Sequence, residues 1–579
     1  MKKIKQHLFL FLFANFMFFS CMNEFSVQTT SKLEESPVNE SSEVIKLGSQ
    51  RENPFTLLSR QVVADSEENY IYFKIRTNDF ENLAKIENIL GDLQTVPLDY
   101  EVLEGGCENP ENPENDEYTP WFYAMRPIEI YKQVQELGEI EEIFRTYLSE
   151  EDLIAFSEND NSDSGARFFW KNYKSVQPKG KVQFWDEVLQ KYVPLEGAKV
   201  TVSQWCHVKT VYTKSDGTFD IGENFTSFWQ NTANIKVTFS KKNSDSVYNA
   251  FSPITSYYNA GDKSISSLSD CTINIVNNTK QVNYARILNA STVYRNLAKA
   301  DNITTPSAIK FWAANYMSSA ITLMQDVLGV DATSIGAVIG TVNPGVGNII
   351  GALSGAALAS YLPDIIIGVQ KPSTKTLSER IIETVFYEMA HASHYTAIGV
   401  GQVSYWNLEY LKMLGGWISL IWQGESPLEN CYNDGSSKQV CLIESWAYFY
   451  GYYLIDKYYN TNIRNSTKNP NAIITERNYK NLLEYTITDY TDYFYPQAFY
   501  DLIDDEQDEK LNDDGNVVEN GTADKCSNYT ISQIFAPYKN FSTQSISEWY
   551  KKFVELYVFS DEQEKANIKA TFKHNGVDL

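Results

Sequence analysis

Hydrophobic and polar positions near the start of the chain follow the short periods of strands and helices. The run Tyr70–Arg76 is rich in aromatic and β-branched residues and partly alternates, which predicts a strand. The stretch 79–90 has helical spacing, and 97–102 predicts a second strand. Residues 51–165 are therefore expected to form a small α+β domain with a proline-containing loop near 108–113.

The next segment has a different sequence pattern, in which short runs of alternating apolar and polar residues are separated by turns that contain glycine and aspartate. Such runs end near residues 184, 202, 221 and 239, a spacing typical of a β-sandwich over 178–275. The order G-x-V, P-L-x-G-A-x-V-x-V, T-x-S-D-G-x-F resembles the carboxypeptidase regulatory-like, prealbumin-type module. That resemblance implies a rigid, non-catalytic domain, in which His207 is an ordinary strand residue.

Residues 281–460 are mainly helical by pattern, and the tail to 579 mixes helical stretches with an acidic loop. We therefore expect 281–579 to form a helical domain that completes an α+β multidomain chain. Small residues recur every four positions within 335–359, which favours a tightly packed buried helix pair. A membrane-inserting hairpin is the alternative, but Asn343-Pro344 interrupts the run and neither half reaches the roughly 20 apolar residues of a membrane span. The acidic stretch 504–520 predicts a solvated loop rather than a calcium site, because it lacks the EF-hand order.

The first residues predict export and a lipid anchor. Residues 1–20 begin with lysines, continue with an apolar run and end with Ser20 before Cys21, the order of a lipoprotein signal peptide. Cleavage before Cys21 would leave that thiol for lipidation, with 21–50 as a flexible tether. The alternative is an ordinary signal peptide with an incidental cysteine. We expect a lipid-anchored protein of the cell envelope, facing the periplasm or the surface of the outer membrane.

The net charge narrows the classes of partner that the protein is expected to bind. The net charge of −25 over 579 residues repels phosphate backbones, which excludes nucleic acid as the expected partner.

Six cysteines follow Cys21, and an exported protein can pair them in disulfides. Cys431 and Cys441 bracket a polar turn and are the pair that we expect to form a disulfide. No CxxC spacing occurs, so a cysteine-zinc site is not expected.

Candidate chemistry concentrates on one predicted helix that begins after Thr376 or Ser378. Its sequence from 387 to 394 is Y-E-M-A-H-A-S-H. A zincin helix carries H-E-x-x-H, in which the two histidines bind zinc and the glutamate polarises the attacking water. Glu388 and His391 occupy the base and second-ligand places, whereas Tyr387 stands at the first-ligand place. His394 shares the stripe of His391, about one turn along the helix.

A glutamate on a second helix is the third zinc ligand of gluzincins, and Glu444 in the segment E-S-W-A fits that place. Together with the runs N-P-F, Y-I-Y-F-K, P-D-I-I-I and F-Y-D-L-I-D, these segments resemble a group of Gram-negative lipoproteins of unassigned activity over roughly residues 50–510. In that group the helix usually reads H-E-L-A-H-A-S-H. The resemblance implies a zincin-like fold, with Glu388 as base and His391 and Glu444 as zinc ligands.

Tyr387 leaves three outcomes open, because a neutral phenol is a poor zinc ligand and its pKa near 10 must fall before it binds as phenolate. Zinc is bound through His391, Glu444 and either His394 or Tyr387; or it is bound weakly without catalysis; or it is not bound. An active site of this kind would hydrolyse a peptide or protein substrate. The alternative function is a non-enzymatic envelope lipoprotein that captures a peptide, a glycan or a protein partner.

Overall fold

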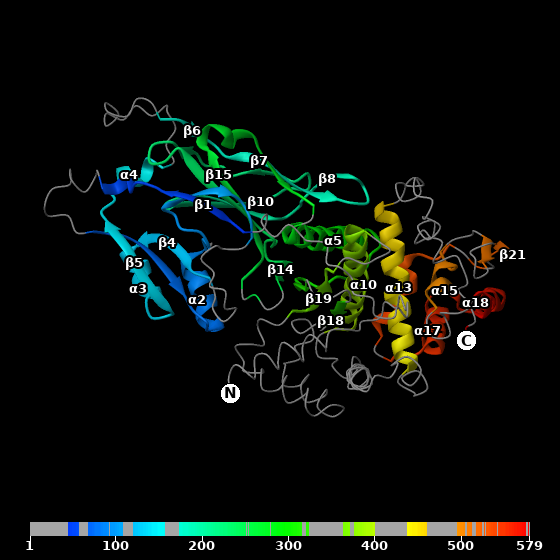
Figure 1. The fold of residues 1–579 in the computed structure, drawn as a ribbon. Helices are drawn as coiled ribbons and strands as arrows, with labels where there is room; N and C mark the ends of the chain where they lie inside the picture. The colour runs from blue at the N-terminus through cyan, green and yellow to red at the C-terminus, as the bar shows by residue number, and fades with distance from the viewer. Residues whose placement is uncertain are drawn as a thin grey trace, which may run out of the picture. The chain divides into compact units, whose positions relative to one another are not determined.

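The computed structural model is a mixed α+β chain, as expected, and divides into two compact units (Figure 1). Unit 1 comprises Glu187–Leu189 and Ala290–Leu579, and unit 2 comprises Phe25–Asp186 and Gln190–Asn289, apart from residues outside the description. The structure describes residues 44–56, 68–91, 93–107, 120–156, 173–249, 252, 254–277, 279–314, 320–322, 363–370, 376–399, 437–459, 495–503, 507–511, 517–523, 526, 528–540, 542–574, 577 and 579.

Unit 2 begins with an antiparallel sheet that helices cover on one face. The strand β2 (Tyr70–Arg76) lies between β4 (Phe122–Pro127) and β5 (Glu139–Thr146). Alternate residues of β2 pack against α2 (Phe80–Leu90) and α3 (Ile128–Val134). The predicted strand 70–76 and helix 79–90 are confirmed, and the second predicted strand is β3 (Tyr100–Glu104), which pairs with β1 (Lys46–Gln50).

An aromatic cluster covers the other face of this sheet. Tyr72 of β2 and Phe144 of β5 meet the ring of Trp205 edge-on, with ring centroids 6.0 and 6.2 Å away. Trp205 is only 2% exposed and lies in the two-residue turn between β9 (Lys199–Gln204) and β10 (His207–Tyr212). Its φ of +51° belongs to the left-handed region, which a tryptophan rarely adopts. Burial of the Trp205 ring therefore stabilises a turn whose backbone conformation is unfavourable by itself.

Two further sheets account for most of the second half of unit 2. One is antiparallel, in the order β10-β9-β13-β15, and the other has the order β11-β7-β16, with β8 also paired to β7. The strands expected near 180–184, 199–202, 218–221 and 235–239 are all present. The remaining strands and short helices of unit 2 are η2 (Pro54–Thr56), α4 (Glu150–Ile154), β6 (Ser175–Val176), β7 (Lys179–Asp186), β8 (Lys191–Pro194), β11 (Thr218–Asp220), β12 (Phe225–Thr226), β13 (Thr232–Thr238), β14 (Ser246–Asn249), β15 (Tyr257–Ser264), η4 (Ile265–Asp270) and β16 (Cys271–Ile275).

Unit 1 contains strands where the pattern predicted mainly helix. After α5 (Lys280–Ala300), in which the boundary between the units falls, come β17 (Lys310–Ala314), β18 (Ala320–Thr322) and β19 (Ile365–Gly368). β19 pairs in parallel with β17 and antiparallel with β18, which is an edge strand of the described sheet. Most described residues of this region are helical, as the pattern predicted, but these strands were not foreseen, because they are short, almost wholly buried runs and periodicity does not separate such runs from buried helix.

Two long helices form the centre of unit 1 (Figure 1). α10 (Leu377–Ile398) starts at its predicted N-cap Thr376, whose side chain accepts the backbone N–H of Glu379. Glu187 also caps this end: its carboxylate accepts the N–H of Ser378 at 3.0 Å, and its own N–H donates to the Ser378 hydroxyl at 2.9 Å. α13 (Ser437–Tyr459) packs along α10.

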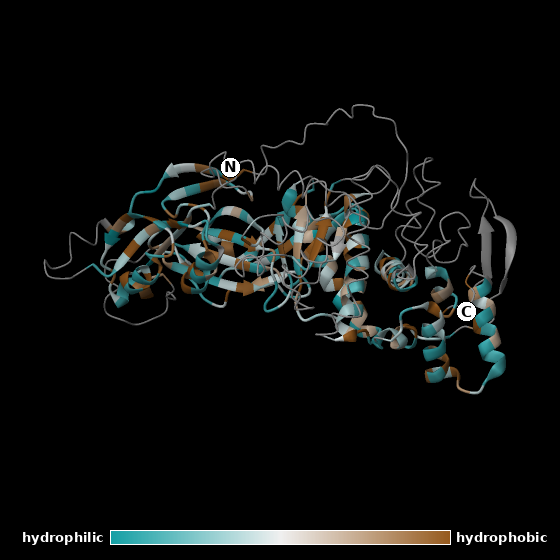
Figure 2. Cartoon of the chain, turned by 90° about the horizontal axis from the view of Figure 1, so that it is seen from below, coloured by the Kyte–Doolittle hydropathy of each residue, from teal (hydrophilic) through white to brown (hydrophobic). Residues whose placement is uncertain are grey.

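Short helices complete unit 1 around this pair, and Figure 2 shows brown and teal positions alternating along them. Trp549 and Phe553 form the buried side of α17, which packs on Phe499 and Phe572. These elements are α15 (Pro496–Tyr500), α16 (Ile531–Phe535), η5 (Ala536–Lys539), α17 (Ile546–Phe553), the π-helix η6 (Val554–Val558) and α18 (Glu562–His574).

The acidic stretch near the C-terminus was predicted as a loop, but its described part forms an antiparallel pair, β20 (Gln507–Leu511) and β21 (Val517–Ala523). Main-chain pairing needs no apolar alternation, which is why the polar sequence gave no strand signal. The leader, Cys21, the tether to residue 43, the segment 335–359 and Cys431 lie outside the described residues. Among the helices that are described, none has the length and apolarity to cross a membrane.

Candidate functional site

The predicted site residues come together where α10 faces α13. Tyr387, Glu388 and His391 lie on α10 and Glu444 lies on α13. Each is at most 3% exposed, so the group is shielded from bulk water. Tyr387 and His391 are one turn apart on the same side of the helix, with ring centroids 4.8 Å apart in an edge-to-face contact.

Glu444 is the shared partner of this group. The Tyr387 hydroxyl donates a hydrogen bond to Glu444 Oε2, and the same carboxylate oxygen lies 3.4 Å from His391 Nε2. Two polar side chains of α10 thus converge on one carboxylate oxygen of α13. The other ring nitrogen of His391, Nδ1, is buried and has no hydrogen-bond partner among the described atoms.

Glu388 lies against the sheet. Thr322 of β18 is buried, and its hydroxyl donates a hydrogen bond to Glu388 Oε2. Thr322 was missed by the sequence reasoning, and the residue carries no local signal, since β18 itself was not predicted. The edge strand therefore holds the carboxylate that occupies the base position of the motif.

His394 lies on the stripe expected for it but packs into aromatic surroundings. Its ring stands edge-on to Tyr538 at 4.9 Å and to Phe535 at 6.4 Å. Burial, assisted by the charge of His391, lowers the pKa of His394 to about 3, so the ring is neutral near pH 7. The neighbouring Ser393 shares a 2.7 Å hydrogen bond with Tyr294 of α5.

The electrostatic environment of His391 has the opposite effect to that of His394. Burial alone would lower its pKa, but the charge of Glu444, the hydrogen bond to that carboxylate and the charge of Glu388 outweigh burial and raise the pKa. Two buried carboxylates therefore stabilise the protonated form of this imidazole against the effect of burial.

Zinc fits part of this arrangement. Bonds of about 2.0–2.1 Å at a tetrahedral angle would separate a nitrogen and an oxygen ligand by about 3.4 Å, which is the distance between His391 Nε2 and Glu444 Oε2. The third position holds a phenol whose proton points to Glu444, and His391 Nδ1 lacks the acceptor that usually orients a zinc ligand. In the described part of the chain, no three His, Cys, Asp or Glu side chains group to hold a metal. These residues therefore do not provide the ligands of a complete hydrolytic zinc centre.

Comparison with known proteins assigns no family. No protein-family model matches the chain, and no curated protein matches it significantly.

The predicted disulfide stays a prediction. Cys441 is a free thiol near the start of α13, where burial raises its pKa to about 12, and its expected partner Cys431 is outside the description. His207 is, as expected, a strand residue: it begins β10 and stacks on Phe225 at 4.2 Å.

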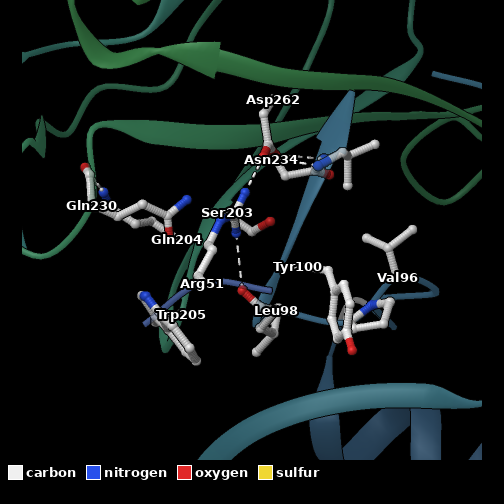
Figure 3. A pocket seen from close by; sticks show the side chains of 12 residues that line it. Arg51, Val96, Leu98, Tyr100, Ser203, Gln204, Trp205, Gln230, Asn234 and Asp262 are labelled. Carbon is white, nitrogen blue, oxygen red and sulfur yellow. Dashed lines mark hydrogen bonds and ion pairs between the residues drawn. The ribbon is translucent and has the colours of Figure 1, made fainter. Parts of the chain in front are cut away.

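Unit 2 has a small recess beside the turn that carries Trp205 (Figure 3). Arg51 crosses it, forming an ion pair with Asp262 and donating to the Leu98 carbonyl at 3.0 Å. The remaining space suits about one water molecule. We interpret this recess as a structural junction within unit 2.

Proposed function

We propose that this protein is an exported, lipid-anchored envelope protein whose C-terminal half is a degenerate zinc-peptidase-like domain with impaired catalysis. The observation that carries the proposal is the 3.4 Å separation of His391 Nε2 and Glu444 Oε2, next to a buried Glu388 on the same helix. This is the arrangement that two ligands and a base would take in a gluzincin site.

The surrounding fold supports the same proposal. The helix that carries the motif packs beside a sheet whose edge strand, β18, runs antiparallel to its neighbour and contacts Glu388. We further propose that the strands of 178–275 form a prealbumin-type module, in keeping with their order and turns. Tyr387 supports impaired catalysis, because its phenol donates a proton where a histidine would offer a lone pair.

Zinc analysis of two proteins tests the proposal. Tyr387→His restores the H-E-x-x-H order and should bind close to one zinc ion per chain, whereas wild type should bind it far more weakly. Zinc below one-tenth of an equivalent in Tyr387→His would contradict a zincin-derived site. Tyr387→Phe, which also changes the phenol but adds no nitrogen, is the matched control and should not gain zinc.

Turnover is tested separately with a peptide library. If Tyr387→His cleaves peptides, the added change Glu388→Gln should abolish cleavage, because the water would lose its base. Cleavage that survives Glu388→Gln would contradict the assigned role of that carboxylate.

One observation favours the second candidate function, a binding protein without turnover. The Tyr387–Glu444 hydrogen bond links the facing helices α10 and α13 through protein side chains alone, a contact that suits a scaffold that captures a peptide, a glycan or a protein partner. A binder should retain its ligand after Glu388→Gln. The lipid anchor is tested by palmitate labelling, which Cys21→Ala should remove.

A further inference from the structure

One sheet of unit 2 has an outer face of polar and aromatic side chains. Buried and partly exposed residues alternate along β7, with Val182 and Phe184 in the core. The side chains at 181, 183 and 185 therefore point to the opposite face. β16 pairs with β7 in parallel and β8 pairs with it antiparallel, which places Thr272, Asn274 and Tyr192 beside them in three rows.

The row near the end of β7 is an aromatic pair. Trp185 and Tyr192 lie directly opposite each other, with ring centroids 5.3 Å apart and ring planes at 77°. Both residues are partly exposed. Neither the indole N–H nor the phenol hydroxyl makes a hydrogen bond to the residues that the structure describes. The pair thus offers apolar ring surface together with two polar groups for a ligand.

The middle row is an amide pair. Gln183 Nε2 donates a 2.7 Å hydrogen bond to Asn274 Oδ1. This bond holds the two amides side by side and leaves Gln183 Oε1 as an acceptor and Asn274 Nδ2 as a donor. Alternate residues along a strand are about 6.6 Å apart, so the three rows span about 13 Å. An extended ligand with many hydroxyl groups would match this row and its neighbours.

Lys181 gives the third row a positive charge. Within the described part of the chain, no carboxylate forms an ion pair with Lys181. The outward acid of the neighbouring strand β11, Asp220, pairs instead with Lys179 at 3.1 Å. The chain as a whole has a net charge of −25, so this face differs in sign from the rest of the protein. Charge complementarity therefore favours an anionic ligand.

We propose that this outer face, formed by Lys181, Gln183, Trp185, Tyr192 and Asn274, binds an anionic polysaccharide whose sugars carry carboxylates. The C–H faces of sugar rings are apolar and stack on Trp185 and Tyr192, sugar hydroxyls pair with the two amides, and a carboxylate pairs with Lys181. An acidic peptide would supply the charge but not the flat ring faces. The inference rests on the second candidate function, ligand capture, and names its ligand.

Binding of the full-length protein to immobilised polygalacturonate, a polymer of a uronic acid, tests the proposal. Wild type should bind this polymer, and uncharged dextran should bind about tenfold more weakly because it lacks carboxylates. Trp185→Ala should weaken binding of polygalacturonate about tenfold, because it removes the larger stacking ring. Phe559→Ala is the matched control, since Phe559 is an aromatic side chain of unit 1 that is 70% exposed, and it should bind as wild type does.

Lys181→Met provides a second route if Trp185→Ala fails to fold, which circular dichroism checks. It keeps the apolar stem, removes the charge, and should weaken binding of polygalacturonate and reduce the dependence of that binding on salt. Absence of binding by wild type, or unchanged binding by folded Trp185→Ala or by Lys181→Met, would overturn the proposal. Equal binding of polyglutamate would also overturn it and assign the face to an acidic peptide.

The result is separable from the fate of the site on α10. Binding of polygalacturonate with no zinc in Tyr387→His would retain the polysaccharide face and reject the zincin-derived site. Zinc in Tyr387→His with no binding of polygalacturonate would do the reverse.

Discussion

Tyr387 changes the chemistry of its site through a single proton. A neutral imidazole at this place could turn a lone pair towards a metal, whereas the phenol donates its proton to Glu444. Glu444 is thereby held by a hydrogen bond and lies close to His391. The same substitution that removes a zinc ligand therefore also supplies a reason for the site to stay ordered.

Removing this phenol should cost stability. Tyr387→Phe leaves a buried carboxylate oxygen with one donor fewer, and we expect a loss of about 1–3 kcal/mol in the free energy of unfolding. Urea unfolding followed by circular dichroism measures it. Tyr212→Phe on β10 is a control and should change stability little, because the Tyr212 hydroxyl makes no hydrogen bond to the residues that the structure describes. Equal effects of the two changes would argue against a specific role of the Tyr387 hydroxyl.

His394 should make the protein less stable in acid. Its pKa is lowered to about 3 in the folded state, so between pH 6.5 and 3 the unfolded chain binds a proton that the folded chain does not. Stability from this residue is present above pH 6.5 and is lost as the pH falls, by about 2 kcal/mol between pH 7 and pH 5. The raised pKa of His391 acts on the other side of pH 6.5, where its contribution declines as the pH rises.

Urea unfolding of wild type and His394→Gln at pH 5 and pH 7 tests this. The variant should be less stable at pH 7, because packing against Tyr538 changes, but its stability should depend less on pH between these values. An unchanged pH dependence would assign the acid sensitivity to other groups.

The site was predictable from sequence only where spacing along one helix carried the information. Tyr387, Glu388 and His391 were found from their order, and Glu444 from resemblance; Tyr387, His391 and Glu444 meet in the structure, whereas Glu388 contacts Thr322 of β18. Thr322 was not predictable, since its contact with Glu388 bridges 66 positions and depends on an edge strand without a sequence signal. The surroundings of His394 likewise depend on Tyr538, which is remote in sequence.

At the scale of elements, the contact between α10 and α13 depends on Gly451. A Cβ at Gly451 would lie 3.2 Å from the Tyr387 Cα and 3.3 Å from its backbone nitrogen. Both atoms belong to the main chain of a buried helix, which cannot turn aside as a side chain can. Glycine is therefore retained inside α13 although alanine forms helix better by about 1 kcal/mol.

Gly451→Ala should consequently destabilise the protein by about 1–2 kcal/mol, because overpacking outweighs the gain in helix propensity. Thermal unfolding measures the change, and Gly451→Ser and Gly451→Val should extend it in order of size. A stabilised Gly451→Ala variant would mean that the two helices can move apart without penalty.

The elements themselves were predictable where polarity alternates with a clear period. The strand 70–76, the helix 79–90 and the N-cap Thr376 all appear as expected. β17 and β19 were not predicted, because buried residues on both faces erase the alternation. The paired strands in the acidic segment were missed for the opposite reason, since their residues are too polar to show a pattern.

At the scale of the folded units, a buried ion pair connects distant segments of unit 2. Arg51 follows β1, and Asp262 lies on β15, 211 positions away; their side chains are 14% and 9% exposed. Asp262 also accepts the N–H of Val102 on β3. One carboxylate thus connects three segments that the sequence separates widely (Figure 3).

Arg51→Met should destabilise unit 2 by about 3 kcal/mol, because it leaves a buried carboxylate without its cation. The double change Arg51→Met with Asp262→Leu should cost less than the sum of the single changes, which a double-mutant cycle in urea measures. Lys46→Met breaks an exposed pair with Glu104 in the same unit and should have little effect. Additive effects at Arg51 and Asp262 would show that the two side chains act independently.

Trp205 has a consequence for any attempt to divide the chain. A fragment that starts near residue 173 would keep the strands β9 and β10 but lose Tyr72 and Phe144, against which the ring is buried. It would present an indole to solvent at the tip of a hairpin whose backbone is unfavourable without that burial. The two halves of unit 2 are thus mutual folding partners, and the natural piece for separate expression is the whole of unit 2.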